Sequence, residues 1–151
     1  MTTATLRSFC YRTTTEWLGR KEVRFASSPR KQPFVVTSPP EFRGKDGEWT
    51  PEELFVGAIE TCLMLTFASL IEKHHLPVES YSSEAIGLLE FAEDVYRFTR
   101  VTIKPTIVIN DETAAPKVLE LISAALGDCL IANSIITSVS VEPEVVMSAC
   151  E

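Results

Sequence analysis

The first third of the chain alternates short β-rich stretches with turn residues. Residues 7–17, 22–27 and 32–38 are rich in aromatic, valine and threonine side chains, and LGRK and SPRK between them are typical of turns. This pattern predicts a three-stranded antiparallel meander. Residues 39–49 (PPEFRGKDGEW) carry two prolines, two glycines and five charged side chains, which indicates an exposed loop. Loops of this length are often functional.

A long helix is predicted over residues 50–75, TPEELFVGAIETCLMLTFASLIEKHH. Thr50 is a good N-cap, Pro51 suits the first helical position, and Glu53 completes a capping box. The length would also fit a membrane span, but Glu60 interrupts the apolar run and the cap is that of an ordinary helix. Because apolar side chains lie all around the cylinder, the helix must be enclosed on most sides, which predicts a homodimer interface.

The middle of the chain reads as a β-hairpin. Pro77 ends the long helix, and residues 78–91 and 96–109 follow as two β-rich segments joined by the acidic turn at 92–95. Their alternation of apolar and polar positions is imperfect, yet it favours strands over a helix.

The last part of the chain predicts two helices and a strand. Residues 113–126 have helical spacing with Gly127 just past their end, and a second short helix is expected over 129–136 with Asp128 as its cap. Residues 138–146 are expected to form a closing strand. The order βββ-α-ββ-α-α-β indicates an α+β fold, and we expect residues 1–151 to form a single domain.

Composition and charge narrow the function classes. The hydrophobic content is 45%, enough for a real core in a chain of 151 residues. The net charge is −7 and the 14 lysines and arginines are scattered, so a nucleic-acid or anionic-membrane binder is not expected. The first twenty residues contain no apolar segment of the signal-peptide kind. We therefore expect a cytoplasmic protein without a membrane span.

Cysteine spacing argues against a metal site. The four cysteines are Cys10, Cys62, Cys129 and Cys150. They lie far apart without a CxxC or Cys/His pattern, which disfavours both structural zinc and a secreted disulfide framework. His74 and His75 are expected to interact with the negative end of the long helix rather than to bind metal. No cofactor is expected.

Helix electrostatics make Cys129 the more acidic thiol candidate. Cys62 lies about twelve residues from its helix cap, too deep for the helix dipole to act, and a lone cysteine on an apolar helix is more often structural. Cys129 would stand in the first turn of the predicted short helix, where free N–H groups favour a thiolate, although Asp128 opposes this. A thiolate at Cys62 would need an external cation.

Several segments resemble the OsmC/Ohr family of osmotically inducible and organic hydroperoxide resistance proteins. TPEELFVGAIETC (50–62) is similar to the family's NPEEL…AAC helix, and GDCLIANSI (127–135) to its second-cysteine segment, often CPVSNAL. EFRGKDGEWTPEEL (41–54) resembles the family's glycine-rich approach to this helix, and EWLGRKEV (16–23) its W-x-G-R turn. The order of predicted elements is also similar, so the resemblance covers nearly the whole chain.

The resemblance implies a thiol-dependent peroxidase that acts on organic hydroperoxides, built as an intertwined homodimer with active sites at the subunit interface. It implies that Cys62 is the peroxidatic cysteine, which becomes a sulfenic acid and then condenses with Cys129 as the resolving cysteine. A dithiol reductant, such as a lipoyl-type thiol, would reopen the disulfide.

The resemblance also implies an ion pair that steadies the thiolate. Glu52 matches the family's glutamate, and Arg20 is the best match for its arginine, with Arg24 and Arg43 as alternatives. Ten residues of helix span ~15 Å, so Glu52 would orient the arginine or act on the partner's site rather than touch Cys62 of its own chain.

Two residues depart from the family pattern. Leu130 replaces the proline that commonly follows the second cysteine, and Ala132 stands where serine is frequent. The resolving segment could therefore suit another partner or react more slowly. The alternative hypothesis is a non-catalytic dimeric module, in which Cys62 is core packing and the interface binds an apolar small molecule or a protein partner.

Overall fold

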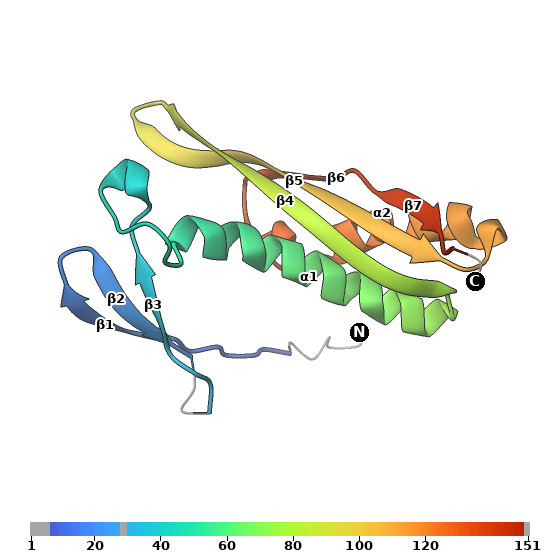
Figure 1. Cartoon of the computed structure of the whole chain (residues 1–151), viewed down its shortest axis with the longest axis horizontal. Helices are drawn as coiled ribbons and strands as arrows, with labels where there is room; N and C mark the ends of the chain where they lie inside the picture. The colour runs from blue at the N-terminus through green and yellow to red at the C-terminus, as the bar shows by residue number, and fades with distance from the viewer. Residues whose placement is uncertain (1–6, 28–29, 150–151) are drawn as a thin grey trace, which may run out of the picture. The chain divides into compact units, whose positions relative to one another are not determined.

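The structure is a computed structural model that describes residues 7–27 and 30–149 (Figure 1). The chain divides into two compact units, Met1–Leu54 and Phe55–Glu151. Cys150 lies outside the described residues. That the whole chain forms a single domain stays a prediction.

The first unit contains the predicted antiparallel meander. Strands β1 (Thr14–Gly19), β2 (Glu22–Ala26) and β3 (Phe34–Thr37) pair in the order β1-β2-β3. The first strand begins later than predicted, because residues 7–13 have no strand pairing. The β1–β2 turn uses Gly19 and Arg20, whose φ angles of 107° and 49° reverse the chain tightly.

The segment between the meander and the long helix contains a short 3₁₀ helix, η1 (Pro40–Phe42). Arg43 follows it in the left-handed conformation (φ 65°), and its N–H donates to the carbonyl of Pro40 at 2.9 Å. Gly44 is required next, because a Cβ there would lie 1.4 Å from the carbonyl oxygen of Ser38. The predicted loop is thus a shaped turn.

The long helix α1 (Pro51–His74) begins and ends as the sequence predicts. Thr50 Oγ1 accepts from the N–H of Glu53 at 3.2 Å, and Glu53 Oε2 accepts from the N–H of Thr50 at 3.0 Å, so the capping box is formed. His75 takes a left-handed conformation (φ 51°), which ends the helix two residues before Pro77.

Within the described residues, α1 is the one helix long and apolar enough to span a membrane by length and composition. These criteria do not separate a membrane span from a core helix. Glu60, in the middle of the helix, accepts a hydrogen bond from Ser83 Oγ at 2.5 Å. The carboxylate that interrupts the apolar run is therefore hydrogen-bonded to the strand that follows the helix, β4 (Val78–Ala92).

The second unit is built on a four-stranded sheet. Strands β4 (Val78–Ala92) and β5 (Val95–Ile109) form the predicted hairpin, with a tight turn at Glu93 and Asp94, which have φ angles of 53° and 64°. Strands β6 (Ser138–Val141) and β7 (Glu144–Met147) both pair with β5 in parallel. Two short strands replace the single closing strand of the prediction.

The predicted second short helix is wrong. Helix α2 (Ala115–Asp128), preceded by the 3₁₀ turn η2 (Glu112–Ala114), runs through Gly127 and ends at Asp128. Only a 3₁₀ turn, η3 (Ala132–Ser134), lies within 129–136. The N–H groups of Asn133 and Ser134 bond to the carbonyls of Cys129 and Ile131, which makes a short turn and no further helix.

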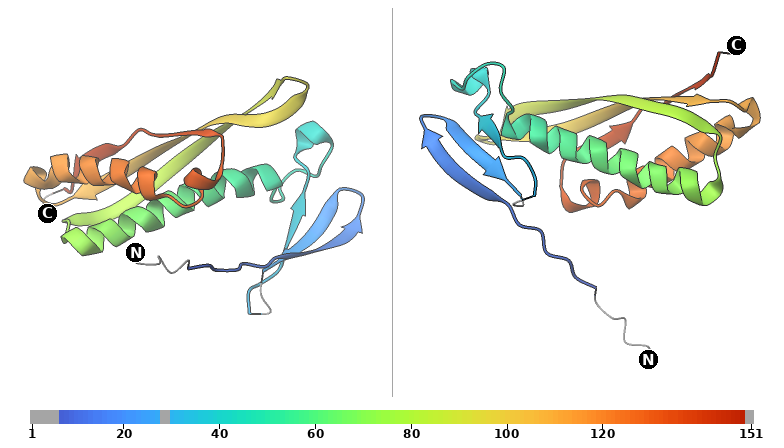
Figure 2. Two further views of the ribbon diagram at one scale, coloured as in Figure 1. Left: turned by 180° about the vertical axis from the view of Figure 1, so that it is seen from behind. Right: turned by 60° about the horizontal axis from the view of Figure 1, so that its bottom comes forward.

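Both helices cover one face of the sheet, as Figures 1 and 2 show. The core between them is made of alternate residues of β5 and one side of each helix: Val101, Ile103, Ile107, Ile109, Ile59, Leu63, Phe67, Val118, Leu121, Ile122 and Ala125. Gly87 on β4 lets α1 approach closely, because a Cβ there would lie 2.5 Å from Val56 Cγ2. The α+β fold class is confirmed.

Candidate active site

Cys62 lies in the middle of α1 and is only partly buried. Its neighbours Ile59 and Leu63 are fully buried against the sheet and α2, which fixes the rotation of the helix. Leu65, on the other side, is 69% exposed. Cys62 therefore lies at the boundary between the core and the uncovered side of α1, where a thiol is both held and reachable.

Cys129 follows the end of α2 and is completely buried. Its backbone is extended (φ −67°, ψ 111°), and its N–H donates to the carbonyl of Leu126 at 3.2 Å. The Sγ atom lies 4.0 Å from the carbonyl oxygen of Ile59, one turn before Cys62 on α1. The Cys129 thiol donates a long, weak hydrogen bond to that carbonyl, and its hydrogen bond with the Cys62 sulfur is one cause of the shifted pKa values of both thiols.

The pKa of Cys62 lies below its ordinary value. Burial by itself raises it, but the main-chain N–H of Ile131, the thiol of Cys129, the main-chain N–H of Leu130 and the hydroxyl of Thr66 all donate to the sulfur and outweigh burial. Hydrogen bonds to the charged form of a group favour that form. Cys62 is therefore the more acidic thiol of the pair.

The pKa of Cys129 is raised. Burial is the main cause; the main-chain N–H groups of Ala132 and Ile131 oppose it, and the neighbouring Cys62 raises the pKa further through its charge and its hydrogen bond. The rival expectation that Cys129 is the more acidic thiol is therefore wrong. The physical reason is its place: it stands at the C-terminal end of α2, where the helix dipole disfavours an anion, and not in the first turn of a helix.

Two kinds of donor to Cys62 were missed by sequence reasoning. Thr66 lies four residues after Cys62 on the same helix face, a spacing that could have suggested it. Its hydroxyl donates to the carbonyl of Cys62 at 2.8 Å, so its single proton is shared between this carbonyl and the Cys62 sulfur. The N–H groups of Leu130 and Ile131 carry no sequence signal, because every residue except proline has one.

The predicted ion-pair residues belong to the first unit. Arg20 lies in the exposed β1–β2 turn, and its carbonyl accepts from the indole N–H of Trp17 at 3.0 Å. Glu52 lies in the first turn of α1, and its Oε2 is buried without a hydrogen-bond partner among the described residues. A buried carboxylate oxygen needs a donor, which is what the expected arginine would supply. Their pairing stays a prediction.

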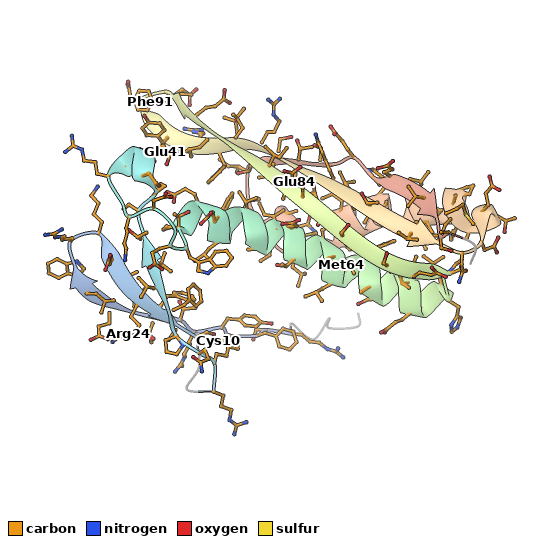
Figure 3. The ribbon with its side chains drawn as sticks, in the orientation of Figure 1. Cys10, Arg24, Glu41, Met64, Glu84 and Phe91 are labelled. Carbon is orange, nitrogen blue, oxygen red and sulfur yellow. The ribbon has the colours of Figure 1, made fainter. Side chains whose placement is uncertain are left out.

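The alternative arginines are also placed in the first unit. Arg24 points from β2 (Figure 3) and pairs with Glu16 on β1 at 2.5 Å, with both side chains at least half exposed. Arg43 is the left-handed residue after η1. Arg24 thus has a carboxylate partner on the neighbouring strand, which makes it a weaker candidate for the thiolate than Arg20.

The remaining candidates stand apart from the two thiols. Cys10 is exposed, with a free thiol, and His74 and His75 are exposed at the end of α1. Over residues 7–27 and 30–149, no group of three or more His, Cys, Asp or Glu side chains is arranged to hold a metal ion.

The family is decided by a match to the sequence model described as OsmC-like protein, which spans residues 44–144. The chain belongs to the OsmC-like family. The matched residues include Glu52, Cys62 and Cys129, whereas Arg20, Arg24 and Arg43 precede them.

Individual relatives of this OsmC-like chain are distant in sequence and close in fold. It is 24% identical over 112 residues to the uncharacterized protein YmaD of Bacillus subtilis (strain 168), covering 72% of this chain and 75% of YmaD. An OsmC-like protein of unknown function from Vibrio cholerae superposes with a TM-score of 0.82 at 22% identity, covering 91% of this chain and all of that one.

An organic hydroperoxide resistance protein from Elizabethkingia anophelis gives a TM-score of 0.74 at 18% identity and covers 94% of this chain and 99% of that one. At these identities the solved structures show the shared fold, and the function rests on the site itself.

Proposed function

We propose that the chain is a thiol-dependent peroxidase that reduces organic hydroperoxides in oxidative-stress defence. The observation that carries the proposal is the pair of adjacent thiols, Cys62 with a lowered pKa and Cys129 with a raised one. A reactive cysteine needs thiolate character and access, and Cys62 has both. The organic hydroperoxide resistance proteins among the structures of this fold support the substrate class.

The chemistry assigns one step to each thiol. The Cys62 thiolate attacks the outer peroxide oxygen, the O–O bond breaks, and the alkoxide takes up a proton and leaves as an alcohol. Cys62 is then a sulfenic acid. The Cys129 sulfur attacks the sulfenic sulfur, an S–S bond forms, and the hydroxyl leaves as water. An external dithiol, such as a lipoyl-type compound, reduces the disulfide and becomes a disulfide itself.

Burial suits Cys129 to the second step. Its sulfur is shielded from solvent, so a peroxide reaches Cys62 first. The Cys129 thiol is hydrogen-bonded to Cys62 and is therefore beside any sulfenic acid that forms there. A nearby thiol captures a sulfenic acid before a second peroxide oxidises it further.

Arg20 and Glu52 complete the proposal. An arginine can stabilise a thiolate through its charge and donate hydrogen bonds to the departing oxygen. The buried, unpaired Oε2 of Glu52 would hold that guanidinium in position.

The homodimer is part of the same proposal. On the uncovered side of α1, Leu65 is 69% exposed and Gly57 has open space where a Cβ would stand. A second copy of the chain would cover this side. We expect an obligate interface above the ~2,000 Å² that marks that class.

A thiol titration tests the proposed activity. After one equivalent of cumene hydroperoxide, the enzyme loses two thiols per chain rapidly, and peptide mapping finds Cys62 joined to Cys129. Exposure alone would instead direct oxidation to Cys10, the exposed thiol among the three cysteines that the structure describes. The Cys10→Ser variant is the matched control and should react like the wild type. Slow, indiscriminate oxidation would favour the non-catalytic binding module.

A further inference from the structure

Residues 129–134 form a turn in which the first three carbonyl groups accept hydrogen bonds from residues later in the turn. The carbonyl of Cys129 accepts from the N–H of Asn133 at 3.0 Å, that of Leu130 from Ser134 Oγ at 2.7 Å, and that of Ile131 from the N–H of Ser134 at 3.0 Å. The side-chain amide of Asn133 also donates to the carbonyl of Gly127 at 2.9 Å. These bonds hold the peptide planes of the turn in one orientation.

The N–H groups of Leu130, Ile131 and Ala132 belong to the same peptide planes as these bonded carbonyls, so their orientation is fixed as well. Hydrogen bonds from Leu130 and Ile131 are among the causes that lower the pKa of Cys62, and hydrogen bonds from Ala132 and Ile131 act on the pKa of Cys129. Such rigid donors need little reorganisation when negative charge forms on the sulfur.

Cys62 cannot obtain equivalent donors from its own helix. The N–H groups around it in α1 are bonded to carbonyls of the preceding turn, and the free N–H groups of the helix lie at its start. The groups that lower the pKa of Cys62 are two main-chain N–H groups, the Cys129 thiol and the Thr66 hydroxyl, and none of them carries a positive charge. The turn after Cys129 is therefore the main source of donors.

We infer that the main-chain N–H of Leu130 is a working part of the site, donating to the Cys62 sulfur both as thiolate and after its oxidation. The role of this N–H in catalysis rests on the proposed function, whereas its position rests on the hydrogen bonds of the turn. The Leu130 side chain is 73% exposed, so its identity matters chiefly because it is not proline. Proline has no N–H to donate.

The departure from the family pattern thus gains a physical role. The proline that commonly follows the second cysteine in the resembling family segment would carry no N–H at this position. Leu130 has one, and this is the group that the inference assigns to the site.

The variants Leu130→Pro and Leu130→Ala test the donor directly. Both shorten or remove the exposed side chain, but only proline removes the N–H. The fraction of Cys62 thiolate near neutral pH, followed by iodoacetamide labelling of the Cys62 peptide, should fall about tenfold in Leu130→Pro, as expected for one hydrogen bond to a charged group. Leu130→Ala should label like the wild type.

A measurement on the wild type covers the case in which Leu130→Pro does not fold. In ¹⁵N-labelled protein, the amide protons of Leu130 and Ile131 should shift downfield with the midpoint of Cys62 ionisation, and Cys62→Ser should abolish that shift. The amide of Asn133, which is bonded to the Cys129 carbonyl, is the internal control and should move little.

The two proposals fail separately, because no peroxide enters these titrations. The inference is overturned if the proline and alanine variants label equally, or if the chemical shift of the Leu130 amide proton does not change while Cys62 ionises. Either result leaves the peroxidase proposal standing. A titrating amide in a protein that does not consume hydroperoxide overturns the peroxidase proposal and leaves the donor in place.

Discussion

At the scale of single residues, the two thiols differ in the balance between burial and donors. At Cys62 the hydrogen bonds outweigh burial and the pKa is lowered, whereas at the fully buried Cys129 burial outweighs the N–H donors of Ala132 and Ile131 and the pKa is raised. In the proposed mechanism this asymmetry sets the order in which the two thiols act.

Exchanging each cysteine for serine separates their roles. Cys129→Ser should consume one equivalent of hydroperoxide and leave a sulfenic acid on Cys62 that dimedone traps, because the attacking thiol remains and the resolving thiol is gone. Cys62→Ser should consume essentially none, as followed by loss of peroxide. A dimedone label on Cys129 of the wild type would contradict this assignment.

The pH dependence of labelling follows from the two pKa directions. For a thiol the reactive form is the anion, so the labelling rate rises as pH passes the pKa upward. Cys62 should reach half its maximal rate below the pH that an ordinary thiol requires, and Cys129 above it. Peptide-resolved alkylation between pH 5 and 10 measures both curves, and a reversed order would remove the geometric basis of the proposal.

Arg20 can be tested by the same labelling. If it stabilises the thiolate as proposed, Arg20→Ala should move the half-maximal labelling of Cys62 to higher pH. Arg24→Ala is the matched control, since Arg24 already pairs with Glu16. An unchanged curve in Arg20→Ala would leave Arg43 or no arginine in this role.

At the scale of elements, the α1 cap can be examined by substitution. Thr50→Ala removes the two hydrogen bonds of the Thr50 hydroxyl with Glu53 and should lower the free energy of unfolding by about 1 kcal/mol. Thr50→Ser keeps the hydroxyl and should stay close to the wild type. Urea unfolding at fixed protein concentration measures both, and equal midpoints for Ala and Ser would show that the cap contributes nothing.

Local signals were enough to predict the elements whose hydrogen bonds are local. The capping box, the left-handed stop before Pro77 and the acidic hairpin turn each leave a recognisable residue pattern, and these elements lie where expected. The segment 129–136 was predicted wrongly because its apolar spacing resembles that of a helix, whereas its course depends on contacts with Cys62, which is distant in sequence. The split of residues 138–147 into β6 and β7 depends on parallel pairing with β5, which is distant in sequence.

The candidate site was only partly accessible to sequence. The resemblance singled out Cys62 and Cys129, and the structure brings these two thiols together. Which of them is acidic could not be derived from helix position, because the deciding donors are main-chain groups of an irregular turn. The contribution of Arg20 and Glu52 stays a prediction.

At the scale of the whole molecule, the exposed apolar side of α1 predicts that two copies of the chain associate as a homodimer. Sedimentation at micromolar concentration should find a dimer, and Leu65→Lys should shift it toward monomer by placing a charge on that side. Glu72 is exposed near the end of the helix. The Glu72→Lys variant is therefore the control for an added positive charge and should leave the dimer intact. A folded wild-type monomer at this concentration would contradict both the interface and a shared site.

In the proposed cycle, the separation of the two thiol pKa values also fixes how many protons accompany the two electrons. Between the pKa values of Cys62 and Cys129, the reduced pair carries one proton, on Cys129, so reducing the disulfide takes up one proton instead of two. The reduction potential then falls by about 30 mV per pH unit, half the slope of an ordinary dithiol. Every donor that stabilises the thiolate also makes the disulfide more oxidising. The turn after Cys129 thereby sets how readily a dithiol of modest reducing strength can regenerate the protein.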